Sequence, residues 1–257
     1  MFLSIAFIEI LLLSCVICVL YAWFGLCFAS SMIMAMYLIG YHNLRHVISA
    51  ILIAQIAVAM LSSVVRRSIV PKVSASMRSG IIIGIAAIAS FVAAYTVGIR
   101  LVNTYRLALN GALLMLAALV NLVCSEGTRT DVDLSGSALT GLIAGGVKGA
   151  LGGGTTGIMI VMQRLRGRGF DDALFRTLVS HAFICSAAAL PYAIAFGIDI
   201  SVLVPMVTGS LGGVCLGWVI QRLMGGNTRR RASSALMGLF SALLFFESVE
   251  SALGASI

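Results

Sequence analysis

Residues 142–160 read LIAGGVKGALGGGTTGIMI, a stretch in which three consecutive glycines interrupt an otherwise apolar run. The whole run covers residues 134–165, which is too long for a single helix across a bilayer, because such a helix needs about 20 residues. Gly152, Gly153 and Gly154 allow the backbone to turn without a steric penalty from Cβ. The run therefore predicts two helical arms joined by a glycine break.

The composition of the chain is that of a membrane protein. Of its 257 residues, 60% are hydrophobic and 10% are charged, and the mean hydropathy is +1.09. Soluble proteins have about 45–50% apolar and about 25% charged residues, so we expect lipid to be the solvent. Long continuous apolar runs, without alternation, indicate helices. We expect a multi-pass integral membrane protein, in a prokaryotic cell membrane.

The same order of apolar segments occurs twice in the chain. A broken run at residues 3–41 precedes three ordinary spans, and the glycine-rich run precedes three more. The ordinary spans are residues 47–65, 80–98, 107–124, 173–196, 202–223 and 232–253. Gly25, at the first break, precedes Gly152 by 127 residues. We therefore predict an all-α bundle of two repeats, residues 1–126 and 127–257, each a broken-helix hairpin plus three transmembrane helices.

The basic residues predict the orientation of the two repeats. Most of them gather in three short loops: Arg66, Arg67, Lys72 and Arg78; Arg164, Arg166 and Arg168; and Arg222, Arg229, Arg230 and Arg231. Basic loops stay on the cytoplasmic side, and they account for the net charge of +8 without nucleic-acid binding. If each broken run enters and leaves on one side, each repeat crosses the membrane three times. The second repeat is then inverted relative to the first.

Inverted repeats with broken helices are typical of secondary transporters, whose site lies at the repeat interface. Backbone donors and a positive dipole at the restarted helix suit an anion. We expect the site to comprise Lys148, Gly152, Gly153, Gly154, Thr155 and Thr156 from the second break, and Gly25, Ser30 and Ser31 from the first. The alternatives are a tight turn with close packing, a Lys148 side chain that snorkels to the surface, and serines that only join helices.

Two ionisable residues in apolar runs, His181 and Glu247, are candidates for proton coupling. A packed histidine and a glutamate at the outer interface are the alternatives. We interpret Asp171, Asp172 and Asp199, which precede apolar helices, as N-caps.

Cys15 and Cys18 form a C-x-x-C, but it lies inside an apolar helical run without a second pair or a nearby histidine, so we expect no metal and no cofactor. The patterns G-x-x-x-x-G-K-[ST] and G-x-S-x-G do not occur, and we do not expect an enzyme.

The chain resembles the sulfite exporter TauE/SafE family of membrane proteins. Residues 142–160 are similar to its second signature, residues 197–217 with Asp199 and Pro205 to a later loop and small-residue helix, and residues 229–244 to its last helix. The sequence departs from the family where Leu26 and Cys27 replace expected glycines and where no proline follows Gly157. The resemblance implies two related halves and transport of small sulfur-containing or organic anions, such as sulfite, thiosulfate or sulfoacetate.

Together these features predict a secondary transporter for a small anion, with its site at the helix breaks near the membrane midplane. A passive anion channel and a non-catalytic membrane assembly subunit are the alternatives. The patterns leave the identity of the anion, the direction of transport, the coupling ion and the oligomeric state open. They also do not decide whether the first broken run is a re-entrant hairpin or two full spans.

Overall fold

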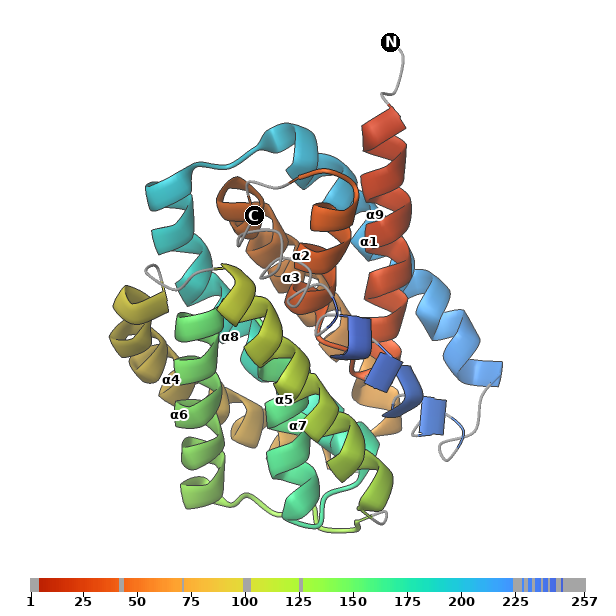
Figure 1. Ribbon diagram of the computed structural model, residues 1–257. Helices are drawn as coiled ribbons and strands as arrows, with labels where there is room; N and C mark the ends of the chain where they lie inside the picture. Colours follow the sequence, from red (N-terminus) through yellow and green to blue (C-terminus); the bar gives the residue numbers. More distant parts are fainter. Residues whose placement is uncertain are drawn as a thin grey trace.

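The computed structural model consists of packed helices (Figure 1). It describes residues 5–41, 44–70, 72–98, 103–124, 127–223, 228, 231–232, 234–236, 238–239, 241–243 and 246. Its helices are α1 (Ile5–Phe24), α2 (Phe28–Leu38), α3 (Leu44–Arg66), the 3-10 turn η1 (Arg67–Ile69), α4 (Val73–Gly98), α5 (Asn103–Val123), α6 (Leu134–Leu151), α7 (Thr155–Leu165), α8 (Phe170–Phe196) and α9 (Ile200–Leu223). The described residues contain no strand, and the predicted all-α class is confirmed.

Five helices are long and apolar enough to cross a membrane. The segments that meet this criterion of length and composition are Ile5–Phe24, Val47–Ile69, Val73–Thr96, Phe170–Phe196 and Ile200–Ile220. Their outward faces carry large apolar side chains, such as Val92 and Ile194, which are 65% and 77% exposed. Apolar side chains on the outside of such a bundle are favourable in lipid. The chain is therefore an integral membrane protein made of a helix bundle.

Both predicted helix breaks are present. Residues 25–27 separate α1 from α2, and residues 152–154 separate α6 from α7. The two arms of each run are unequal, with 20 and 11 residues in the first run and 18 and 11 in the second. Since a helix rises about 1.5 Å per residue, α1 alone can span a bilayer, whereas the 11-residue arms are half-helices.

The long helices pack closely because glycines face neighbouring backbones. Helix α6 lies against α4, and a methyl group on Gly145 would collide with the carbonyl oxygen of Ala87. Helix α9 lies against α1 in the same way, with Gly213 against the carbonyl oxygen of Cys15. Small residues at such contacts let two membrane helices approach. The helix pairs α3–α8, α4–α8 and α3–α9 are also closely packed.

A buried ion-pair network ties three connections together at one end of the bundle. Arg66 pairs with Asp171 at 3.0 Å, and Arg176 pairs with Asp172 at 2.9 Å. Arg168 donates to the carbonyl oxygen of Asp131 at 2.8 Å. Two of the basic loops predicted to share a side therefore lie at the same end. The third basic loop falls largely outside the described residues.

The acidic residues at the helix starts have different roles. We expected Asp171 and Asp172 to be N-caps, but they lie inside the first turn of α8 and pair with arginines instead. Asp199 does accept from the Ser201 amide nitrogen at 2.9 Å, as an N-cap does. Asp133 caps α6, and the Gly136 amide that donates to its carboxyl holds the pKa of Asp133 below its usual value.

Candidate functional site

The two helix breaks meet inside the bundle. The amide nitrogen of Gly154 lies 3.1 Å from the sulfur of Cys27 and 2.9 Å from the hydroxyl oxygen of Ser30. The Ser30 hydroxyl donates in turn to Asn110 Oδ1 on α5, at 3.2 Å. The backbone at Gly25, Gly152 and Gly154 has φ of 74°, 75° and 76°. A side chain is strained in this left-handed region, so glycines are needed there.

Lys148 lies in the last turn of α6, next to the second break, and only 1% of it is exposed. Its ammonium donates to Gln55 Oε1 on α3, at 3.0 Å. The side chain therefore points into the bundle, and the snorkelling alternative does not describe it. Among the described residues, no carboxylate lies within ion-pair distance of this ammonium. A buried cation in a membrane usually faces a cavity or a partner charge.

The donors around Gln55 fix the orientation of its amide. An ammonium can only donate, so the atom that faces Lys148 must be the oxygen, and the Cys185 thiol donates to the same oxygen at 3.2 Å. The amide nitrogen of Gln55 then faces His181 Nδ1, at 3.5 Å. Because this nitrogen carries only donors, His181 Nδ1 acts as an acceptor. In the neutral histidine, the proton is therefore on Nε2.

His181 is completely buried and both of its ring nitrogens have partners. The Tyr21 hydroxyl of α1 donates to Nδ1 at 2.8 Å, and the Tyr21 ring stacks on the imidazole with the centroids 5.8 Å apart. On the other side, Nε2 donates to the hydroxyl oxygen of Thr155 at 3.0 Å. Residues from α1, α3, α6, α7 and α8 thus form one polar cluster, which comprises Tyr21, Gln55, Lys148, Thr155, His181 and Cys185.

This polar cluster has more donors than acceptors. The Lys148 ammonium also interacts with the Cys185 thiol, which leaves at least one of its hydrogens, together with the hydroxyl hydrogen of Thr155, without an acceptor among the described residues. Two further hydroxyls of the breaks, Ser31 Oγ and Thr156 Oγ1, are buried without a partner in that part of the chain. Buried polar groups are normally satisfied. The surplus of donors and the positive charge suit a ligand that only accepts hydrogen bonds, such as an oxyanion.

The structure brings together most of the predicted site residues. Lys148 and Thr155 belong to the polar cluster, Gly154 and Ser30 join the two breaks, and Gly153 has no room for a side chain, because a Cβ would lie 2.5 Å from Ser30 Oγ. His181 binds Thr155 directly. Glu247 lies outside the described residues. Among the described residues, no group of three His, Cys, Asp or Glu side chains could hold a metal ion.

Three members of the polar cluster were not among the predicted site residues: Tyr21, Gln55 and Cys185. Each lies within an apolar run, where one polar side chain resembles a helix-packing residue. Gln55 carried the clearest signal, because it is an amide in the middle of the span at residues 47–65. Its partners come from α6 and α8, and only the tertiary packing shows them.

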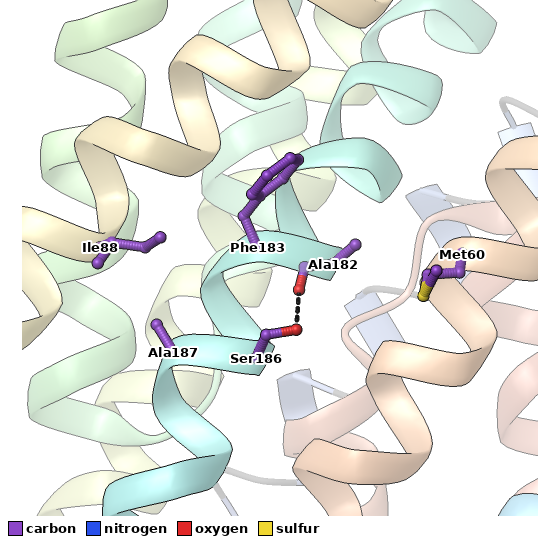
Figure 2. A pocket seen from close by; sticks show the side chains of 6 residues that line it. All are labelled: Met60, Ile88, Ala182, Phe183, Ser186 and Ala187. Atoms are coloured by element: carbon purple, nitrogen blue, oxygen red, sulfur yellow. Dashed lines mark hydrogen bonds between the residues drawn. The ribbon is translucent and has the colours of Figure 1, made fainter.

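A separate cavity of about 480 Å³ lies on the outer face of α8 (Figure 2). Its lining is Met60, Ile88, Ala182, Phe183, Ser186 and Ala187. The one hydroxyl there, of Ser186, donates to the carbonyl oxygen of Ala182 and is satisfied. This groove offers an anion no charge and no spare donor. Although Ala182 and Phe183 of this lining follow His181 in the sequence, the His181 side chain is buried and does not line the groove.

Comparisons of the chain with family models, curated proteins and solved structures found no match.

Proposed function

We propose that the protein is a secondary transporter that carries a small anion across the membrane and binds it where the two helix breaks meet. One observation carries this proposal. The Lys148 ammonium is buried beside the break, and its hydrogen-bond partner is the neutral amide of Gln55. A buried charge is costly unless an opposite charge compensates for it. An anion that occupies the polar cluster supplies that charge.

The substrate we propose is a sulfur-containing or organic anion, such as sulfite, thiosulfate or sulfoacetate. The resemblance to the TauE/SafE family suggests this class, and the chemistry of the donors supports it. The spare hydrogens of Lys148 and Thr155 match the oxygen atoms of sulfite or sulfonate groups. Hydrogen bonds between charged partners are about twice as strong as neutral ones.

We also propose that residues 1–126 and 127–257 are inverted repeats. The order of long helix, half-helix and long helices recurs, and the left-handed glycines Gly25 and Gly40 precede Gly152 and Gly167 by the same number of residues. Packing supports the same correspondence, in which α1, α3 and α4 of the first half match α6, α8 and α9 of the second. The contact of α1 with α9 then corresponds to that of α6 with α4, and the contact of α3 with α9 to that of α8 with α4. Figure 1 adds that α1 runs down from the N-terminus while α6 runs up.

Burial of the polar cluster favours a carrier over an open channel. Tyr21, Gln55, Thr155 and His181 are completely buried. A water-filled pore through the cluster would expose these side chains. An occluded site needs a conformational change to reach either side, as alternating access requires. A non-catalytic assembly subunit has no need for an uncompensated lysine at its centre.

The test is transport by the purified protein in liposomes, with labelled sulfite, thiosulfate and sulfoacetate. We expect saturable uptake of at least one of these anions by the wild type. Lys148→Met keeps the length of the side chain but removes the charge, and should reduce uptake about tenfold or more, since a hydrogen bond to a charged group contributes about 1.5–3 kcal/mol. Lys148→Arg should transport at an intermediate rate, because a planar guanidinium fits differently.

Ser186→Ala, in the apolar groove of α8, is the matched control and should transport like the wild type. Uptake of none of the three anions by well-folded wild-type protein would overturn the proposed function. Non-saturable flux would instead favour a channel.

A further inference from the structure

We propose that the transported anion carries two negative charges and crosses the membrane together with one proton, which His181 holds. This inference rests on the proposed function and specifies the charge of its substrate. Its basis is the arrangement of Lys148, Gln55 and His181, in which one amide touches the ammonium through its oxygen, at 3.0 Å, and the imidazole through its nitrogen, at 3.5 Å.

The neutral imidazole has an unshared electron pair on Nδ1, which accepts from Tyr21 and from Gln55. A proton taken up from water can bind to this electron pair. The Tyr21 hydroxyl can then turn and accept instead of donating, because a phenol does both. The contact with Gln55, which at 3.5 Å is the longest in the cluster, is lost in this state. No other bond forms or breaks, and the proton returns to water when the site opens again.

The charges around His181 make proton and anion binding depend on each other. In the described part of the chain, the titratable groups that face the cluster are Lys148 on α6, Tyr21 on α1, Cys27 at the first break and Cys185 on α8 itself. Helices α3 and α7 contribute the uncharged Gln55 and Thr155. No described carboxylate belongs to the cluster. Among the residues that the structure describes, Lys148 carries the only charge in the polar cluster.

A monovalent anion would neutralise Lys148 alone. A divalent anion would leave one negative charge uncompensated in the membrane interior, unless His181 took up a proton. Conversely, a second positive charge one amide away from Lys148 is unfavourable in the empty site. The dianion therefore promotes protonation of His181, and protonation promotes dianion binding by the same factor. Thiosulfate and sulfoacetate are dianions of this kind.

The experiment measures the ratio of internal to external labelled thiosulfate at zero net flux, in proteoliposomes whose membrane potential is clamped at zero. Thiosulfate suits this test because it stays divalent around neutral pH. With the internal pH one unit above the external pH, transport of one proton with each anion should concentrate thiosulfate inside by about tenfold. This ratio is thermodynamic, so a merely slower or less stable protein reaches the same value.

His181→Asn should carry thiosulfate without the proton and reach a ratio near one, whereas Ser186→Ala should retain the wild-type ratio. Wild-type protein that equilibrates thiosulfate to a ratio of one would overturn proton coupling and leave the transporter intact. Tenfold accumulation by His181→Asn would show that another group holds the proton. A wild-type protein that moves none of the three labelled anions would overturn the proposed function itself.

Discussion

The amide nitrogen of Gly154 lies 3.1 Å from the sulfur of Cys27, although 127 residues separate them in the sequence. Each residue is the last of its helix break, immediately before a half-helix. The contact places the starts of α2 and α7 against each other. A movement of one half-helix must therefore disturb the other. A ligand bound in the adjacent polar cluster would be affected by this movement.

Gly154 should not tolerate a side chain. Its φ of 76° costs an alanine about 1–2 kcal/mol, and the new Cβ would lie 2.6 Å from Asn110 Oδ1. We expect Gly154→Ala to lower the thermal unfolding temperature of the purified protein and to abolish transport. Gly167→Ala is the control, since φ is 75° there but no atom lies within 4 Å of its Cβ. Equal shifts for the two variants would mean that the close packing at the break is unimportant.

The interface of α6 with α4 can be tested with two adjacent glycines. Gly145→Ala should destabilise the fold, because its methyl group meets the carbonyl oxygen of Ala87. Gly146→Ala should be neutral or stabilising by about 0.5–1 kcal/mol, since nothing lies within 4 Å of its Cβ and alanine favours helix. Thermal unfolding of both variants in detergent provides the comparison. A stable Gly145→Ala together with an unstable Gly146→Ala would contradict the packing described for α6.

The proposed inverted repeats predict that corresponding residues are accessible from opposite sides of the membrane. Ile5 starts α1 and Val132 precedes α6, 127 positions later, and both are exposed, at 77% and 36%. In a background without the native cysteines, single cysteines at these positions should react with an impermeant thiol reagent from opposite sides of the membrane. Ser74, at the end of the bundle that holds the basic loops, should react from the same side as Val132. If Ile5 and Val132 react from one side, the repeats are not inverted.

The buried acidic group at the basic end should be important for stability. Asp172 pairs with Arg176 at 2.9 Å and with Arg168 at 3.8 Å, and the three side chains are nearly inaccessible. Removal of one partner from a buried pair costs about 3–5 kcal/mol, so Asp172→Asn should unfold at a clearly lower temperature. The exposed pair of Arg129 and Asp131 offers the control Arg129→Met, which should unfold like the wild type. An unchanged Asp172→Asn would show that these arginines do not depend on the carboxylate.

The helix breaks could be predicted from the sequence because a turn of the backbone requires particular residues, such as glycine, at the turn itself. The second break was predicted from the consecutive glycines at 152–154. The first was predicted from Gly25 and from the apolar segments that follow it. The apolar runs likewise predicted the helices, since length and hydropathy alone decide which segments can enter lipid.

The polar cluster was only partly predictable, because its members come from five helices. Lys148 and Thr155 stood out beside the glycines, whereas Gln55 and Tyr21 become neighbours of His181 only through packing. Asp171 and Asp172 were misjudged for a similar reason. Their position at a helix start suggested N-caps, but arginines from other segments compete for the same carboxylates.

The central claim is that Lys148 binds the anion, and direct binding tests it without any assumption about transport. Calorimetric titration of the detergent-purified protein with thiosulfate, sulfite and sulfoacetate should show saturable binding of at least one of them to the wild type. Lys148→Met, with an unfolding transition that confirms its fold, should bind that anion at least about tenfold more weakly. Binding of the same anion to Lys148→Met with wild-type affinity would contradict the account.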